Sequence, residues 1–385
     1  MAGVYDVCPP PFGRSTLAEV LPAIAAHLVG AGTGTDVPGA VDGLGLPAAR
    51  RYVLCLVDGL GAELLAQAAE DAPHLAGVLP GAVRLVSTIP STTATAITTL
   101  GTGVPPGRHG IMGYTFRSAP HRLLNALTWE NGPRDPAAFQ PVTPWWTRLA
   151  GEGVAVSAVA PADFMGTGLT RAALRGARFV PVENERDFPT RTAQVAAAAG
   201  GAERALVYVY ERALDHTGHN HGWRSPQWRR VLHRLDGFVA DLRARLDADT
   251  CLLVTGDHGM VDVPARRKIW VEDDRRLMRH VELVGGEARL RQLYTAAPEA
   301  VAAAWRAVLG EQAEVVLGPE AVDAGWFGPV APNLASRIGD VLALARDDWA
   351  MTSRAAPGEA RMVGMHGGCS PAESAVPLLI DPGKD

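Results

Sequence analysis

The chain has 385 residues, of which 47% are hydrophobic and 20% charged, and its formal net charge at pH 7 is −5. This length and composition are those of a globular protein with one large α/β domain or two domains. The negative net charge excludes general binding to nucleic-acid polymers and to anionic membrane surfaces.

No pattern in the sequence indicates secretion, a membrane span or a disulfide framework. The four cysteines, Cys8, Cys55, Cys251 and Cys369, are far apart and form no Cys-x-x-Cys pair. Near the N-terminus, Asp6 and a cluster of prolines interrupt the apolar stretch that a signal peptide needs. Because no segment approaches about 18 uninterrupted apolar residues, we expect a soluble, cytoplasmic protein.

The first strong strand signal is followed at once by a carboxylate. After a helix expected around 17–29 and a Gly/Pro-rich loop over 30–47, the apolar run Tyr52–Val57 is typical of a strand buried on both faces in a parallel sheet. Asp58 comes next, and a helix is expected to begin near Ala62. Asp58 is therefore either a helix N-cap or a group at the carboxyl edge of a sheet, where sites form.

A strand expected at 83–87 leads into a stretch rich in threonine. Thr88 lies in a loop, and a helix is expected to begin near Thr92 and Thr93 and to end at Thr102-Gly103. Hydroxyls at such a helix start are either caps or groups that present a nucleophile where free amides favour a phosphate.

Strands and helices then alternate as far as residue 263. Around a loop-rich segment at 119–144, we expect a strand at 111–116 and further elements at 145–150, 154–160, 178–182, 192–199, 205–210, 226–246 and 250–254. The strand at 205–210 runs toward Asp215 and His219, and the strand at 250–254 runs into Asp257 and His258. His258 is either a surface residue of a polar turn or a metal ligand.

The pattern changes after Val263, where charged residues cluster and strand-like segments become short. Residues 264–336 are predicted to form a small α+β insertion with strands at 280–284, 288–294 and 313–317 and a helix at 298–309. The main sheet is expected to resume at 340–345 and to end with a strand at 375–380. We therefore predict an α/β fold with a mostly parallel central sheet flanked by helices on both faces, its core formed by residues 1–263 and 337–385.

Six possible metal ligands follow predicted strand ends or lie in glycine-flanked turns: Asp58, Asp215, His219, Asp257, His258 and His366. Carboxylates and imidazoles at one edge of a sheet can bind two divalent ions, which is the usual arrangement for in-line displacement at phosphorus.

These motifs resemble those of the alkaline phosphatase superfamily, and specifically of its type I phosphodiesterase/nucleotide pyrophosphatase family. The matching pieces occur in the family's order within residues 52–380: Val57-Asp58-Gly59, the Thr-rich helix start ending at Thr102-Gly103, Asp215-x-x-Gly218-His219, Gly256-Asp257-His258-Gly259-Met260 and His366-Gly367. Each motif is short, and five in order make the resemblance specific.

The resemblance implies which side chains bind the metals. One ion would be bound by Asp215, His219 and His366. The other would be bound by the nucleophile's oxygen together with Asp58, Asp257 and His258. The family pattern Asp-x-x-Gly-His favours His219 over His216 and His221, and leaves His221 as a candidate for an outer contact to ligands or substrate. The ligand mixture favours zinc, with manganese as the alternative.

The nucleophile of the superfamily stands nine residues before the threonine of the Thr-Gly pair, which here gives Thr93. Thr92 is the second choice. Thr88 is the third, because Thr88-Ile89-Pro90-Ser91 imitates the family's Thr-x-Pro-Asn five residues too early. The family's asparagine is missing, so Arg117 and Asn125 are candidates to hold the non-bridging phosphate oxygens, or are ordinary surface residues.

The implied function is hydrolysis of phosphodiester or pyrophosphate bonds in a small phosphate ester or nucleotide. It would use two divalent metal ions and a covalent phosphothreonine, with net retention at phosphorus. Alternatives from the same superfamily are a phosphomonoesterase, a phosphonate hydrolase and a metal-dependent phosphomutase. The alternative from another class is a non-catalytic metal-binding protein. The sequence carries no signal for the oligomeric state.

Overall fold

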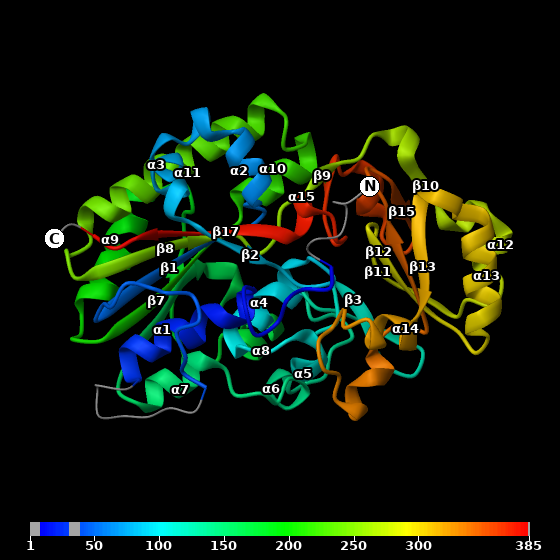
Figure 1. The fold of residues 1–385 in the computed structure, drawn as a ribbon, viewed down its shortest axis with the longest axis horizontal. Helices are drawn as coiled ribbons and strands as arrows, with labels where there is room; N and C mark the ends of the chain where they lie inside the picture. Colours follow the sequence, from blue (N-terminus) through cyan, green and yellow to red (C-terminus); the bar gives the residue numbers. More distant parts are fainter. Residues whose placement is uncertain (1–7, 31–38, 384–385) are drawn as a thin grey trace.

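The computed structural model describes residues 8–30 and 39–383, so the stretch with Asp6 and part of the expected Gly/Pro-rich loop lie outside the described residues. A seven-stranded sheet forms the core, in the order β2-β17-β8-β1-β7-β5-β6 (Figure 1). Its strands are β1 (Arg51–Val57), β2 (Val83–Val86), β5 (Ala155–Pro161), β6 (Arg178–Val182), β7 (Ala205–Glu211), β8 (Thr250–Thr255) and β17 (Ala375–Asp381). Of these seven, β17 alone runs opposite to the other six strands. The predicted α/β fold class with a mostly parallel sheet is confirmed.

Alternate residues of the central strands pack into two hydrophobic clusters, one on each face of the sheet. In β1, Leu54 and Leu56 belong to one cluster, whereas Val53 and Cys55 belong to the other. Burial on both faces explains why β1, β7 and β8 read as unbroken apolar runs rather than as alternating ones.

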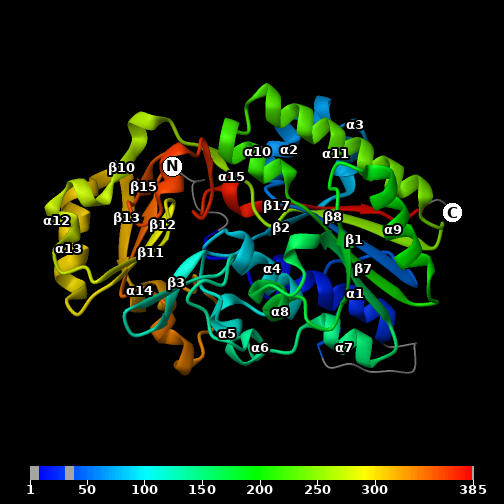
Figure 2. The ribbon, with the colours of Figure 1, turned by 180° about the vertical axis from the view of Figure 1, so that it is seen from behind.

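Helices cover both faces (Figures 1 and 2). The cluster with Leu54 takes residues from α1 (Val20–Val29), α4 (Thr93–Thr102), α7 (Trp145–Gly151) and α8 (Gly168–Ala173). The opposite cluster takes residues from α2 (Ala62–Gln67), α3 (Pro73–Val78), α9 (Phe188–Gly200), α10 (Ala213–His221) and α11 (Pro226–Arg245). The longest, α11, begins where Ser225 accepts a hydrogen bond from the Trp228 amide and Pro226 sits in the first turn.

A second, antiparallel sheet lies beside the core, with strand order β11-β12-β14-β13. Its strands are β11 (Leu283–Glu287), β12 (Leu290–Tyr294), β13 (Ala313–Leu317) and β14 (Val341–Ala345), and its outer helices are α12 (Arg275–Met278) and α13 (Pro298–Leu309). Val341 and Ala343 pack with Trp305 of α13, while Leu342 and Leu344 pack toward the core. This sheet is therefore a layer between α13 and the core.

One strand expectation is wrong: β14 does not return to the main sheet. It pairs with β12 and β13 instead, so the segment 341–345 belongs structurally with the smaller sheet. A fully apolar run signals burial on both faces but does not signal which strands it pairs with. The predicted boundaries of the core and of the 264–336 insertion remain a prediction.

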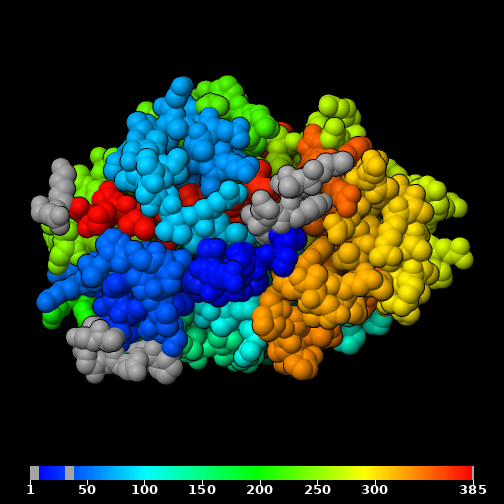
Figure 3. Space-filling model, in the orientation of Figure 1, coloured from blue at the N-terminus to red at the C-terminus, as the bar shows by residue number. Residues whose placement is uncertain are grey.

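Short strands and helices complete the fold. They are the hairpin β3 (Thr115–Ala119) and β4 (Arg122–Asn125), the pairs β9 (Val261–Asp262) with β16 (Gly364–Met365) and β10 (Lys268–Trp270) with β15 (Ala350–Thr352), and the helices α5 (Pro106–His109), α6 (Pro136–Phe139), α14 (Gly318–Asp323) and α15 (Pro371–Ser374). Figure 3 shows the orange surface of the smaller part lying directly against the core. Backbone hydrogen bonds join Gly107 to Phe327 and to Ala331 across this contact.

Two further local expectations need correction. The strand expected at 111–116 begins only at Thr115, because residues 106–109 form α5 and the segment after it is irregular. Asp215 and His219 lie on a helix, α10, rather than in a glycine-flanked turn. Among the described residues, none of the helices combines the length and the apolar character needed to span a bilayer.

Candidate active site

Two adjacent parallel strands provide the first part of the site. Because β1 and β8 are neighbours in parallel register, the residues that follow them emerge side by side at the carboxyl edge. Asp58 follows β1 and Asp257 follows β8, and the Gly59 amide donates a hydrogen bond to Oδ1 of Asp257 at 3.1 Å. Nε2 of His258 lies 3.3 Å from Oδ1 of Asp58 and 3.4 Å from Oδ2 of Asp257.

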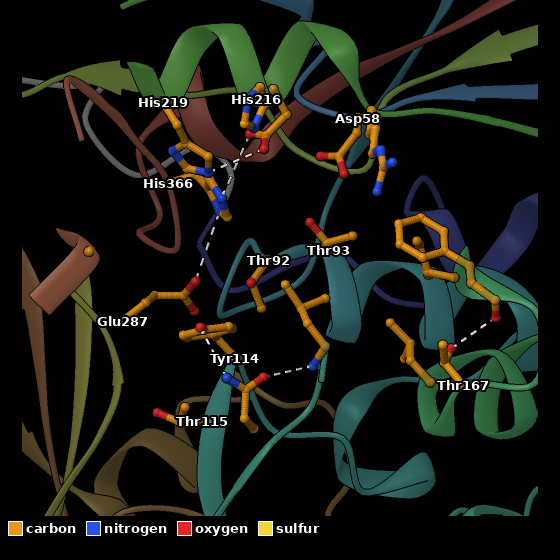
Figure 4. A pocket seen from close by; sticks show the side chains of 18 of the residues that line it. Asp58, Thr92, Thr93, Tyr114, Thr115, Thr167, His216, His219, Glu287 and His366 are labelled. Carbon is orange, nitrogen blue, oxygen red and sulfur yellow. Dashed lines mark hydrogen bonds and ion pairs between the residues drawn. The ribbon is translucent and has the colours of Figure 1, made fainter. Parts of the chain in front are cut away.

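The second part comes from α10 and from the segment after β16. The Asp215 amide donates to the Asp58 carbonyl at 3.1 Å, and one helical turn later Nε2 of His219 lies 3.2 Å from Oδ2 of Asp215. Nε2 of His366 lies 3.9 Å from Oδ1 of Asp215, and the His366 ring stacks on His258 with centroids 3.6 Å apart. The structure thus brings all six predicted side-chain ligands together, several of which are seen in Figure 4.

The three imidazoles are oriented by backbone carbonyls. Nδ1 of His258 lies 2.9 Å from the Gly259 carbonyl, Nδ1 of His219 lies 2.8 Å from the Gly364 carbonyl and Nδ1 of His366 lies 2.9 Å from the Ser91 carbonyl. A carbonyl only accepts hydrogen bonds, so each Nδ1 carries the proton. In the neutral ring, each Nε2 would then present its lone pair to a cation bound among the carboxylates, as metal-binding histidines do.

The donor set fits divalent metal ions. Potential ligand atoms of Asp58, Asp257 and His258 lie within 4.8 Å of one another, and so do those of Asp215, His258 and His366. Oδ1 of Asp58, Oδ1 of Asp215 and Oδ2 of Asp257 are buried and accept no hydrogen bond within the described part of the chain. Buried carboxylate oxygens without a partner are costly, and two bound cations would satisfy them.

Crowding of buried charges shifts the pKa of these groups. Burial raises the pKa of Asp58, and the carboxylates of Asp257 and Asp215 raise it further. Burial, with Asp215 beside it, also raises the pKa of Asp257 to about 6. Burial and the neighbouring His258 lower the pKa of His366 to about 3. Such a cluster favours bound cations, which compensate carboxylates and accept neutral imidazoles.

The three candidate nucleophiles lie in different surroundings. Thr93 is the first residue of α4, lines the central cavity, and places Oγ1 3.2 Å from Nε2 of His258. Thr92, the N-cap residue of α4, also lines the cavity and lies near Glu287 (Figure 4). Thr88 is fully buried and donates to the Pro90 carbonyl at 2.6 Å. Of the three, Thr93 alone contacts the ligand cluster directly.

The other candidate residues from the sequence differ in whether they line the central cavity. His216 lines the central cavity, whereas His221, at the end of α10, lines a different surface groove. Arg117 does not line the cavity: its guanidinium lies 4.5 Å from the Tyr294 ring centroid and donates to the Ser336 carbonyl at 2.8 Å. Asn125 does line the cavity.

Tyr114, which the sequence did not single out, reaches the same cavity through Asn125. Oδ1 of Asn125 accepts from the amides of Leu127 and Thr128, and Nδ2 donates to the Tyr114 hydroxyl at 3.0 Å. Oδ1 of Asn125 and one of its two Nδ2 hydrogens are thus engaged, and the Tyr114 hydroxyl, an acceptor in this bond, keeps its own proton to donate.

Two more site residues were missed by the sequence analysis. The hydroxyl of Tyr210, in β7, donates to Oδ2 of Asp58. Glu287, at the end of β11, enters the cavity from the smaller sheet and places Oε2 3.9 Å from Nδ1 of His366. Burial raises the pKa of Glu287 to about 8. Tyr210 could have been suspected because it lies near the carboxyl end of a buried strand, but Glu287 lies outside every recognisable motif.

A cavity of about 590 Å³ opens in front of these residues. In Figure 4, Thr92 and Thr93 lie between Glu287 on one side and Thr167 on the other. The cavity lining includes two carboxylates, Glu287 and Glu359, and their chain neighbours Ala288, Ala355, Ala356, Pro357, Gly358 and Met362. The apolar and aromatic lining residues, which we call the apolar side, are Ile97, Leu127, Ala160, Phe164, Leu169, Leu174, Phe179, Tyr208 and Tyr210.

The fold and this ligand cluster define an alkaline phosphatase-like α/β protein. Residues 52–368 match the model of the type I phosphodiesterase/nucleotide pyrophosphatase family. Because this match covers most of the chain, the chain belongs to that family, whose described activity is the hydrolysis of phosphodiester and pyrophosphate bonds.

Solved structures of the same fold include two ectonucleotide pyrophosphatase/phosphodiesterase 5 proteins. The murine protein shares 19% identity at a TM-score of 0.68, covering 85% of this chain and 87% of its own. The human protein shares 20% identity at a TM-score of 0.67 with the same coverage. A further murine structure, of an inactive variant in complex with AMP, has a TM-score of 0.67 at 19% identity.

Among curated proteins, the chain is similar to the catalytic subunit of GPI ethanolamine phosphate transferase 3. The Mus musculus protein is 45% identical over 61 residues, which is 16% of this chain. The Homo sapiens protein is 38% identical over 55 residues, or 14% of this chain. The chain matches only 6% and 5% of the lengths of these two relatives.

Proposed function

We propose that the chain is a two-metal phosphodiesterase or nucleotide pyrophosphatase that acts through a covalent phosphothreonine at Thr93. The single observation that carries the proposal is the position of Thr93, whose Oγ1 lies 3.2 Å from His258 and which faces the cavity together with Asp58 and Asp215. A hydroxyl, a metal-binding cluster and a substrate cavity meet at this point.

The proposed metal ligands are those that the resemblance implies. Asp215, His219 and His366 would bind one ion, and Asp58, Asp257 and His258, with the Thr93 oxygen, would bind the other. Their mixed nitrogen and oxygen donors favour zinc, with manganese second. Two bound ions supply electrostatic stabilisation for negative charge on the attacking and leaving oxygens.

The chain's own groups then account for the two displacements. The deprotonated oxygen of Thr93 attacks phosphorus as the bond from phosphorus to the leaving oxygen breaks, which gives a phosphothreonine. Water attacks this ester in the second displacement and regenerates the hydroxyl, so configuration at phosphorus is retained. Thr92 caps α4 without a side-chain hydrogen bond to the first turn, and amides of a first turn are suited to phosphate oxygens.

We further propose that Tyr114 takes the place of the asparagine that the family motif leads one to expect. Its hydroxyl accepts from Asn125 at 3.0 Å and has a proton to donate to a non-bridging phosphate oxygen. Asn125 would act by positioning Tyr114.

The cavity supports a nucleotide-type substrate. The apolar side carries several aromatic residues, and aromatic rings pack well against a flat ring system. The complex of the related murine protein with AMP makes nucleotides the first substrates to test. A cytoplasmic location and the metal identity remain predictions.

The proposal is tested with metal-depleted protein reloaded with zinc or manganese. Bis-p-nitrophenyl phosphate, p-nitrophenyl phosphate and nucleotide diesters are compared, with chelator controls. We expect a chelator-sensitive preference for diesters. Preference for the monoester would instead support a phosphatase or phosphomutase, and absence of turnover with two metals bound would support a non-catalytic metal-binding protein.

A further inference from the structure

Three consecutive residues, beginning with His366, are held by Ser91. Nδ1 of His366 donates to the Ser91 carbonyl at 2.9 Å. The Ser91 hydroxyl accepts from the Gly367 amide at 3.1 Å and donates to the Gly368 carbonyl at 2.8 Å. Ser91 itself is fully buried. The direction in which Nε2 of His366 points therefore depends on how the segment 366–368 is held in place.

The same segment is also held by Glu373, in α15. Oε1 of Glu373 accepts from the Gly368 amide at 2.9 Å, and Oε2 accepts from the Ser370 hydroxyl at 2.6 Å. A Cβ atom on Gly368 would lie only 2.7 Å from Oε1 of Glu373, so a larger residue here would displace that carboxylate. The Glu373 carbonyl accepts from the amide of Gly259, the residue after His258, at 2.7 Å. Glu373 therefore contacts the segments of both stacked histidines.

Arg289 fixes the Glu373 carboxylate from the smaller sheet. It lies in the turn between β11 and β12, and its guanidinium donates to Oε1 and Oε2 of Glu373 at 2.9 and 2.8 Å. It also donates to the Trp349 carbonyl. Both charged side chains are at most 1% exposed. Although burial opposes it, the Arg289 guanidinium keeps the pKa of Glu373 below its usual value. A charged, two-point contact of this kind leaves the carboxylate little freedom to rotate.

A second buried pair of the same sheet has no such connection to the histidines. Arg291, in β12, is 1% exposed and donates to Oε2 of Glu359 and to the Met351 carbonyl. Oε2 of Glu359 also accepts from the Ser353 amide at 3.3 Å, and residue 353 lies in no segment that carries a predicted metal ligand. A buried ion pair in this sheet therefore does not by itself reach the site, whereas the pair of Arg289 and Glu373 does.

We propose that Arg289 and Glu373 are positioning residues for His366, through which the smaller sheet sets the geometry of one metal site. This inference rests on the proposed function, in which Asp215, His219 and His366 bind one ion. Groups that orient a metal ligand typically change metal affinity by about 10–100-fold when they are removed. The smaller sheet is then needed for metal binding as well as for enclosing the cavity.

The experiment measures zinc affinity by competition with a chromophoric chelator, without substrate. We expect Arg289→Met and Glu373→Ala each to lower the affinity for one zinc ion per chain by about 10–100-fold. The absorption spectrum of the cobalt-substituted protein, which reports coordination geometry, should change in the same variants. Ser91→Ala removes only a hydroxyl and should lower the affinity by roughly tenfold, which provides a test where loss of a buried charge prevents folding.

Arg291→Met is the matched control. It removes a buried arginine from the neighbouring ion pair, which has no hydrogen bond to the segment 366–368 within the described residues. Urea denaturation should show a loss of stability in this variant, whereas both zinc ions should keep the affinity of the unaltered protein. An equal loss of zinc affinity in Arg291→Met would overturn the inference, because Arg289→Met would then act only by destabilising the smaller sheet.

A double variant tests whether Arg289 acts through His366. Because His366→Ala removes the proposed ligand itself, adding Arg289→Met should cause little further loss of zinc affinity. Additive losses overturn the inference, and so does unaltered zinc affinity in both Arg289→Met and Ser91→Ala. These two results leave the two-metal proposal intact. Unaltered zinc binding in His366→Ala would instead contradict the metal assignment of the proposed function, and the inference would fall with it.

Discussion

The hydroxyl oxygen of Thr93 lies 3.2 Å from Nε2 of His258. The two residues are 165 positions apart in the chain, and each is fixed by its own element. Thr93 begins α4, whereas His258 follows β8, and its ring is oriented by the Gly259 carbonyl. Among the hydroxyls of the Thr-rich segment, this contact distinguishes that of Thr93 as the candidate nucleophile.

Replacing Thr93 should remove the covalent step and leave the metal cluster in place. We expect Thr93→Ala to lose at least about 10³-fold in kcat, because neither Thr92 nor Thr88 has a hydrogen bond to the ligand cluster within the described residues. Metal content should remain that of the unaltered protein. Stopped-flow measurement of the burst with bis-p-nitrophenyl phosphate checks the prediction.

Thr92→Ala is the matched comparison for Thr93→Ala. Thr92 lines the cavity, but the hydroxyl that lies within hydrogen-bond distance of His258 is that of Thr93, so loss of Thr92 should cost roughly tenfold or less in kcat and should keep the burst. A normal burst in Thr93→Ala that disappears in Thr92→Ala would move the nucleophile to Thr92.

Removing Asp257 should empty one metal site. Its Oδ2 is buried without a hydrogen-bond partner in the described part of the chain, and its Oδ1 accepts from the Gly59 amide. Asp257→Ala should bind about one metal ion fewer per chain and lose turnover. Elemental analysis of the purified variant measures the first effect, and Asp262→Asn, outside the cluster, is its control. Full activity in Asp257→Ala would contradict the two-metal assignment.

The parts of the site that lie at strand ends could be predicted from the sequence. Asp58 and Asp257 each follow an uninterrupted apolar run, and such runs in a parallel sheet end at one common edge. The other ligands were predicted from the family resemblance, which rests on the order of the motifs along the chain. The helical position of Asp215 was not foreseen, since glycine and several histidines in that segment hide the helical pattern.

The contribution of the smaller sheet could not be predicted. Glu287 ends a strand in a segment without a motif, and it reaches the cavity because the β11–β12 hairpin packs against β14. The position of Tyr114 could not be predicted either, because its hydroxyl is held by Asn125 across the β3–β4 hairpin. Both positions follow from strand pairing, which hydrophobic periodicity does not specify.

The buried pair of Arg191 and Glu211 should be essential for stability. Both side chains are 1% exposed, and Arg191 also donates to the Tyr210 carbonyl at 2.7 Å. Arg191→Met leaves a buried carboxylate unpaired, which should lower the free energy of unfolding by about 3–5 kcal/mol. Urea denaturation measures this loss.

The double variant Arg191→Met/Glu211→Leu tests the reason for that loss. Removing both charges should restore part of the free energy of unfolding, because no unpaired charge is left buried. If adding Glu211→Leu to Arg191→Met lowers the free energy of unfolding further instead of raising it, the two charges are not coupled as described.

Acid should destabilise the protein partly through His109. This residue is fully buried. Its Nδ1 accepts from the Ile111 amide at 3.1 Å, so Nε2 carries the proton and donates to Oγ1 of Thr99 at 2.9 Å. Burial, with the Arg337 guanidinium nearby, lowers the pKa of His109 to about 3. The unfolded chain takes up a proton at this histidine below about pH 6.5, whereas the native state does not. Its contribution therefore lowers the free energy of unfolding by about 1.4 kcal/mol per pH unit as pH falls from the unfolded pKa toward the native one.

The variant His109→Asn isolates this contribution to acid sensitivity. Asparagine can accept from the Ile111 amide through its side-chain oxygen but does not titrate. The variant should lose stability through the lost contact with Thr99, and the loss should be largest at neutral pH. Urea denaturation at several pH values between about 4 and 7 should give the variant a shallower pH dependence, by one proton, than the unaltered protein. Parallel curves for the two proteins would show that His109 takes up its proton equally in the folded and unfolded states.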